Sequence, residues 1–166
     1  MRTQDIPLEI SFDEYNSYVP PSINAKLYVV EGSRPKFDYA YQIVDGGTKN
    51  SVGNGDGIIQ YGESFDLVLT VRNSGKGTAS QVQIRLTLLQ KVSRRSSSNR
   101  GVNIFGDSTH QMTNVQPGSS RTASFNIGVK PNTLVSSIPL YLAITDQQYP
   151  DTRLVEEFVI PVDKTV

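Results

Sequence analysis

The sequence predicts an all-β protein: an immunoglobulin-like antiparallel β-sandwich preceded by a short N-terminal extended segment. Apolar and polar residues alternate with a period of two over several stretches, and turns rich in Gly, Asn and Pro separate them. No stretch shows a convincing helical period. Strands joined by tight turns in this way are typical of antiparallel sandwiches. The 166 residues, 37% of them hydrophobic, suit one domain with a short extension.

Residues 1–36 are interpreted as an extension or as the end of a preceding domain, and residues 37–166 as the sandwich. Within the first part, residues 8–12 alternate and residues 26–30 predict a short strand, with a Pro-Pro pair between them. Two short strands bury too little apolar surface to be stable alone. We therefore expect them to pack on the main domain or to belong to a preceding one.

From Phe37 onward the pattern of strands and turns becomes regular. The inward-facing set of the second expected strand is Phe65, Leu67, Leu69 and Val71, and the Asn-Ser-Gly-Lys-Gly stretch that follows is a turn. The further expected strands cover residues 82–88, 123–129, 138–144 and 154–162, and the first covers residues 38–44. A Pro-Gly turn precedes the strand at 123–129.

The glycine-rich stretch before Phe65 has the ligand spacing of a calcium loop. Counting back from Glu63 as position 12 places Asn54 at position 3 and Asp56 at position 5. Gly57 then occupies the sharp-turn position, and Ile58 the position that offers its backbone carbonyl. Because a β pattern follows instead of a helix, the spacing predicts a structural calcium site in a β-domain, not an EF-hand switch.

Position 1 of this loop departs from the pattern, because Val52 stands where an aspartate is expected. Asp45, just before a Gly-Gly pair, is the best substitute, since a loop of this length can fold back on itself. Three carboxylates and one amide suit a hard dication and offer no histidine or thiolate for zinc. The alternative is that Asn-Gly and Asp-Gly are two turn dipeptides in an ordinary hairpin loop.

Two stretches carry a resemblance to a known type of domain. GNGDGIIQYGE at 53–63, followed by LVLTVRNSGKGTA at 67–79, resembles a bacterial immunoglobulin-like accessory domain of the CARDB or adhesion type. FDYAYQI at 37–43 looks most like the region C-terminal to the protease and PDZ parts of carboxyl-terminal processing (tail-specific) serine peptidases. The resemblance covers about residues 37–163 and implies an accessory role beside a catalytic domain in a periplasmic, cell-surface or secreted protein.

A basic loop is expected between two strands. Lys91, Arg94, Arg95 and Arg100 are four of the sixteen basic residues, concentrated in a serine-rich stretch. They could bind phosphate, an acidic partner or an anionic membrane surface. The alternative is a solvated loop at a hairpin tip.

Catalysis is not expected in this segment. His110 is the single histidine and falls in an expected turn, no glycine-flanked nucleophile elbow is present, and the chain has no cysteine. The sixteen basic and sixteen acidic residues cancel, which argues against nucleic acid as a partner, and no apolar run reaches the roughly 20 residues of a membrane span.

Together with the strand pattern, the resemblance implies a non-catalytic accessory domain of a larger exported bacterial protein, with a serine peptidase as the expected neighbour. The domain would act as a calcium-stabilised spacer or a docking module for other domains of the same polypeptide. The alternative is an adhesion or protein-recognition module that binds a partner through a strand edge or the basic loop. The N-terminus lacks a hydrophobic signal core, so we expect the export signal to lie upstream in a longer chain.

Overall fold

The computed structural model describes residues 3–10, 23–30, 32–48, 50–89, 92–93, 96–97 and 101–164. Contacts divide the chain into two compact units, Met1–Ser33 and Arg34–Val166. Among the described residues, no helix is long and apolar enough to cross a bilayer. The single described helical element is a 3-10 turn, η1 (Pro150–Thr152).

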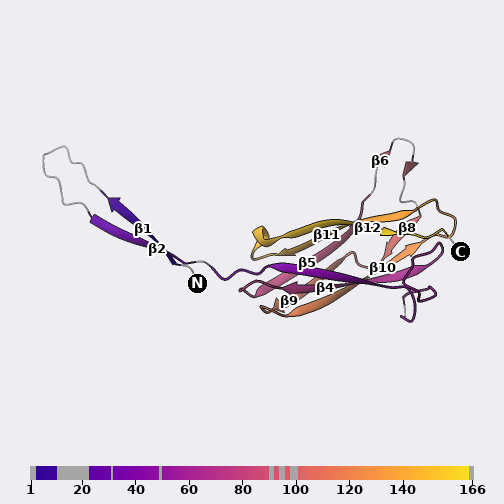
Figure 1. Ribbon diagram of the computed structural model, residues 1–166, viewed down its shortest axis with the longest axis horizontal. Coiled ribbons are helices and arrows are strands. Elements are labelled where there is room, and N and C mark those ends of the chain that lie inside the picture. The colour runs from indigo at the N-terminus through magenta and orange to yellow at the C-terminus, as the bar shows by residue number, and fades with distance from the viewer. Residues whose placement is uncertain are drawn as a thin grey trace. The chain divides into compact units, whose positions relative to one another are not determined.

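The first unit is an antiparallel ribbon. Its strands β1 (Thr3–Ile10) and β2 (Ile23–Val30) pair along their whole length, with Thr3 opposite Val30 and Ile10 opposite Ile23 (Figure 1). The side chains of Leu8 and Ile10 are 44% and 45% exposed. A two-stranded ribbon of this kind has only marginal stability of its own.

The second unit is a sandwich of two four-stranded antiparallel sheets (Figure 1), which confirms the predicted fold class. The first sheet has the order β3 (Phe37–Val44), β4 (Ser64–Asn73), β10 (Ser120–Val129), β8 (Val102–Phe105). The second has the order β12 (Leu154–Pro161), β11 (Ser137–Asp146), β5 (Ala79–Leu88), β9 (Thr109–Val115). A small ladder joins β6 (Val92–Ser93) to β7 (Ser96–Ser97).

Alternation along the strands creates the core between the sheets. The inward set predicted on β4 is fully buried, and Phe125 and Ile127 of β10 lie beside it in the same sheet. The facing sheet contributes Leu140, Leu142 and Ile144 of β11, each 0% exposed. Since successive side chains of a strand point to opposite faces, the period of two in the sequence is the cause of this burial.

Aromatic rings connect the two sheets along one side of the sandwich. β3 and β12 are edge strands of the first and second sheet, and the ring of Tyr41 stacks on that of Phe158 with centroids 5.0 Å apart. Tyr39 contacts the same Phe158 ring at 6.5 Å. Burial raises the pKa of the Tyr39 hydroxyl above its ordinary value, and the negative charge of Glu156 adds to this rise. The hydroxyl therefore stays neutral at this contact between the sheets.

The two strands of the sandwich that the sequence pattern did not predict lie between the basic loop and the Pro-Gly turn. β8 and β9 were not among the strands expected from the sequence, and the expected turn around His110 is part of β9. The sequence of β9, THQMTNV, has a single large apolar residue between its ends, so its alternation is weak. Pairing with β5 organises it as a strand.

Candidate functional site

The loop between β3 and β4 is anchored at Asp45, the residue nominated to replace the missing first calcium ligand. Asp45 follows the last residue of β3 and is only 3% exposed. Its Oδ2 accepts a hydrogen bond from the backbone N–H of Gly57 at 3.1 Å. The chain therefore folds back between Asp45 and Gly57, as the sequence predicted for this loop.

Two successive turns form the tip of the loop. Asn54 Oδ1 accepts from the Asp56 N–H at 3.0 Å, and Asp56 Oδ1 accepts from the Ile58 N–H at 2.8 Å. Gly55 and Gly57 both have a φ of 78°, which only glycine adopts without strain. The Asn54 amide also donates to Asp56 Oδ2 at 2.9 Å. The turn dipeptides named as the alternative to calcium are therefore present as turns.

Glu63 lies at the far end of this loop. Its Oε2 accepts from the Gln60 N–H at 2.9 Å and thereby closes a local turn, while the side chain of Ile58 is 49% exposed. Within the described residues, no three His, Cys, Asp or Glu side chains gather into a group that could hold a metal ion. The loop brings the side chain of Asp45 to the segment 54–58, which itself contains Asn54 and Asp56. The calcium site stays a prediction.

A second anchor of the loop was missed by sequence reasoning. Asp66 is on the outer face of β4, yet it is only 6% exposed, because the first part of the loop covers it. Its carboxylate accepts from Thr48 Oγ1 at 2.7 Å and from Asn126 Nδ2 at 2.9 Å. Asn126 Nδ2 also donates to the backbone oxygen of Asn50 at 2.9 Å. Nothing in the spacing of Thr48, Asp66 and Asn126 could have indicated this cluster.

Asn73 is a third buried polar residue, at the opposite end of β4. Its side chain is 0% exposed and donates to the carbonyls of Gly77 at 2.7 Å and Val115 at 2.9 Å. Its Oδ1 accepts from the N–H groups of Gly75 at 3.0 Å and Lys36 at 3.2 Å. The sequence predicted a turn here, but only the fold brings Lys36 and Val115 to the same side chain.

The residues of the basic loop and the single histidine were also singled out in the sequence. Lys91, Arg94, Arg95 and Arg100 lie outside the described residues, so the role predicted for them stays open. His110 packs its ring edge-on against Phe125, with centroids 4.7 Å apart. The single histidine is therefore accounted for as a packing residue between the two sheets.

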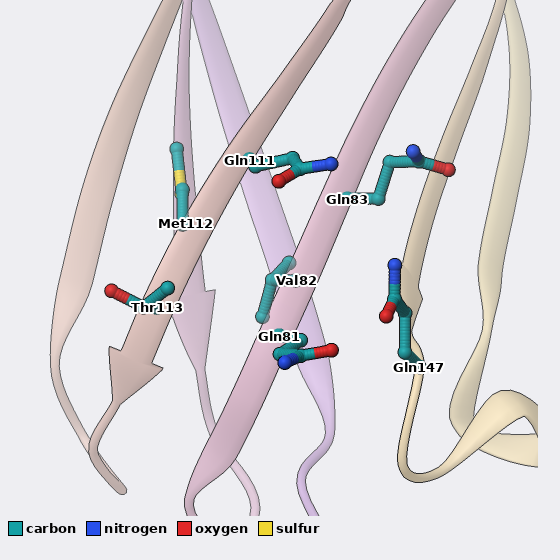
Figure 2. A pocket seen from close by; sticks show the side chains of 7 residues that line it. All are labelled: Gln81, Val82, Gln83, Gln111, Met112, Thr113 and Gln147. Atoms are coloured by element: carbon teal, nitrogen blue, oxygen red, sulfur yellow. The ribbon is translucent and has the colours of Figure 1, made fainter.

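A shallow hollow of about 130 Å³ lies beside β9, between it and the turn that follows β11. Figure 2 shows the amide side chains of Gln83 and Gln111 projecting from the neighbouring strands β5 and β9. The complete lining consists of Gln81, Val82, Gln83, Gln111, Met112, Thr113 and Gln147. No residue of this lining carries a formal charge, so the hollow offers hydrogen bonds without electrostatic selection.

The comparison with solved structures returns matches of low sequence identity. A FixG-related protein from Vibrio parahaemolyticus matches with a TM-score of 0.42 and 15% identity, covering 80% of this chain and 97% of that one. The ASH/PapD-like domain 7 of human CEP192 matches with a TM-score of 0.43 and 9% identity, covering 93% and 99%. No protein-family model and no curated protein matches the sequence. The assignment to an immunoglobulin-like fold therefore rests on the two sheets themselves.

Proposed function

We propose that the sandwich is a non-catalytic accessory domain of a larger exported bacterial protein, and that it acts by docking protein along the edge of a sheet. Three of the four buried polar residues described, Asp45, Asp66 and Asn73, hold loops and turns in place. They support a rigid module, because each is hydrogen-bonded within the fold. A partner would therefore bind to the surface of this module.

The observation that carries this proposal is the difference between β9 and the other three edge strands of the sandwich sheets. β3 and β12 contact each other through Tyr41 and Phe158, and β12 also carries Glu156, Glu157 and Pro161. β8 is only four residues long. These are the features that protect sheet edges from pairing. β9 has seven residues with neither charge nor proline, and no described strand on its far side.

A lysine on this edge is expected to abolish docking. In a pulldown with the purified protein from an extract of the organism that encodes it, Thr113→Lys should lose any partner that wild type recovers, because a charge on an edge strand opposes pairing. Thr87→Lys is the matched control, since Thr87 is exposed on the same sheet but lies on the inner strand β5. Equal recovery by both variants, or no partner for wild type, would contradict the docking role.

Calcium in the loop is the second part of the proposal. Side-chain oxygens of Asp45, Asn54 and Asp56 accept from successive backbone N–H groups of residues 56–58. Carboxylate and amide oxygens of this kind are the ligands that calcium prefers. The ion would replace N–H donors as the partner of these oxygens. Its effect would be on the rigidity of the loop before β4, and hence on the spacer role of the domain.

Thermal unfolding with calcium and with a chelator tests the ion. Binding to the folded state alone stabilises by about 2.7 kcal/mol at a hundredfold excess over Kd, so the melting temperature should rise with calcium. Asp56→Asn should reduce this rise, whereas Asp107→Asn, which changes an exposed carboxylate outside the loop, should leave it intact. Identical melting curves with calcium and chelator would exclude a structural ion.

The peptidase neighbour is proposed from the sequence resemblance over about residues 37–163. A spacer or docking domain C-terminal to protease and PDZ parts would position a substrate or a second domain near the catalytic centre. The full reading frame that encodes this chain checks the proposal directly. A serine peptidase and a signal for export are expected upstream, and a reading frame that encodes neither would contradict both.

A further inference from the structure

The outer face of β9 carries three polar, uncharged side chains that alternate along the strand. Thr109, Gln111 and Thr113 face outward, where they lie opposite Arg85, Gln83 and Gln81 of β5. His110 and Met112 face the core, His110 against Phe125 of the other sheet and Met112 only 9% exposed. The outward order Thr-Gln-Thr is the same in both directions of the chain.

We propose that this palindromic edge binds a second copy of the chain, with β9 antiparallel to β9 of the copy and the two-fold axis at Gln111. The proposal rests on the docking role of β9 and names the partner. In this register Gln111 faces its own equivalent, and each Thr109 faces a Thr113. The two four-stranded sheets would then join into one continuous sheet of the two copies.

Cross-strand chemistry favours this pairing. Thr–Thr pairs directly opposite each other across antiparallel strands are stabilising, and facing glutamine amides can donate to each other. A two-fold interface requires a self-complementary surface, which a palindromic strand provides. A partner strand with charged residues would find no opposite charge on β9, whereas a second copy needs none.

Repulsion between the two copies is also small in this register. Arg85 is the one charged residue of β5, and it lies opposite Thr109 at one end of the pairing. The two Thr109 residues of a dimer would be separated by four residues of strand, at least about 13 Å. Because this exceeds the Debye length of about 8 Å at physiological ionic strength, the two Arg85 charges would be largely screened from each other.

The interface is expected to be weak. A ladder of five residues on each side buries far less than the roughly 1,600 Å² of a typical stable complex. The dimer should therefore appear only as the protein concentration rises into the micromolar range or above. Sedimentation velocity of the purified chain over a concentration series should show a reversible monomer–dimer equilibrium.

Opposite charges at the two-fold axis give the sharpest test. Gln111→Lys places two like charges face to face, as does Gln111→Glu, and each variant alone should dimerise about tenfold more weakly or worse. An equimolar mixture of the two should restore dimerisation, because the facing charges are then opposite. Thr87→Lys should dimerise like wild type. Melting temperatures of the variants show whether each remains folded.

A cysteine at the axis gives a second readout that does not depend on charge. The chain has no cysteine, so Gln111→Cys introduces a single thiol that faces its equivalent across the axis. Residues directly opposite in an antiparallel pair have Cβ atoms about 5 Å apart, close to what a disulfide needs. Mild oxidation should produce a covalent dimer for Gln111→Cys and not for Thr87→Cys.

Two results would overturn the inference. A wild-type chain that stays monomeric throughout the concentration series excludes a second copy as the occupant. A dimer that the mixture of charged variants does not restore, and that Gln111→Cys does not trap, excludes this register. Neither result affects docking of a different protein, which the pulldown with Thr113→Lys measures separately.

Discussion

Replacing Asn73 by leucine is expected to destabilise the sandwich by about 3 kcal/mol or more, since each buried polar group left without a partner costs about 1–3 kcal/mol. Leucine has nearly the shape of asparagine but leaves the carbonyls of Gly77 and Val115 without a donor inside the fold. It also removes the acceptor of the Lys36 and Gly75 N–H groups. Urea denaturation with linear extrapolation measures the difference in unfolding free energy.

Asn103→Leu is the matched control for this prediction. It makes the same chemical change on β8 at an exposed position, and surface substitutions usually change stability by less than about 0.5 kcal/mol. If the Asn73 and Asn103 variants unfold at the same urea concentration, the side chain of Asn73 does not hold the turn and the neighbouring strands together. A loss confined to Asn73→Leu supports its role as a link between Lys36, the turn and Val115.

Phe65→Ala is expected to destabilise the protein by about 3–5 kcal/mol, the usual cost of deleting a buried phenylalanine ring. Phe65 is 0% exposed and is among the largest fully buried side chains of the core. It is also the first inward-facing residue after the loop, next to the buried Asp66. Its loss therefore combines a cavity in the core with a weakened support for the loop, and urea denaturation should show a marked decrease in the midpoint.

Phe105→Ala tests whether this effect comes from burial. The Phe105 side chain is 52% exposed and lies over Gly128, where a Cβ would meet its ring. Removing this ring opens no cavity between the sheets, so the expected loss is well below that of Phe65→Ala. Similar losses for both variants would show that the core between β4 and β11 is less tightly packed than the structure indicates.

Local patterns were sufficient for the fold class and for most strands. Phe65, Leu67, Leu69 and Val71 alternate with polar neighbours, and their burial follows from strand geometry alone. The Asn-Gly and Asp-Gly pairs likewise predict turns, because glycine supplies the left-handed backbone that these turns adopt. The weakly alternating β9 could not be predicted in this way, since its strand conformation depends on pairing with β5.

In the candidate loop, too, some contacts could be predicted from the sequence and others could not. The sequence predicted that Asp45 would fold back toward the Asn54–Asp56 segment, and a hydrogen bond to Gly57 closes this contact. It also assigned Glu63 to the same calcium site, and that assignment stays a prediction. In the structure Glu63 Oε2 accepts from the backbone N–H of Gln60, three residues away. The anchor at Asp66 joins residues far apart in the chain, and no local pattern encodes such a contact.

By itself, the sequence determined the period of most strands, the positions of the glycine turns and the chemistry available in the glycine-rich loop, because each of these depends on neighbouring residues. Only the tertiary structure decided which polar groups are buried and which sheet edge is left unprotected. Asp66 and Asn73 have ordinary positions in the sequence and become buried links through residues brought from other strands. The edge at β9 arises in the same way, since strand order is set by packing between sheets.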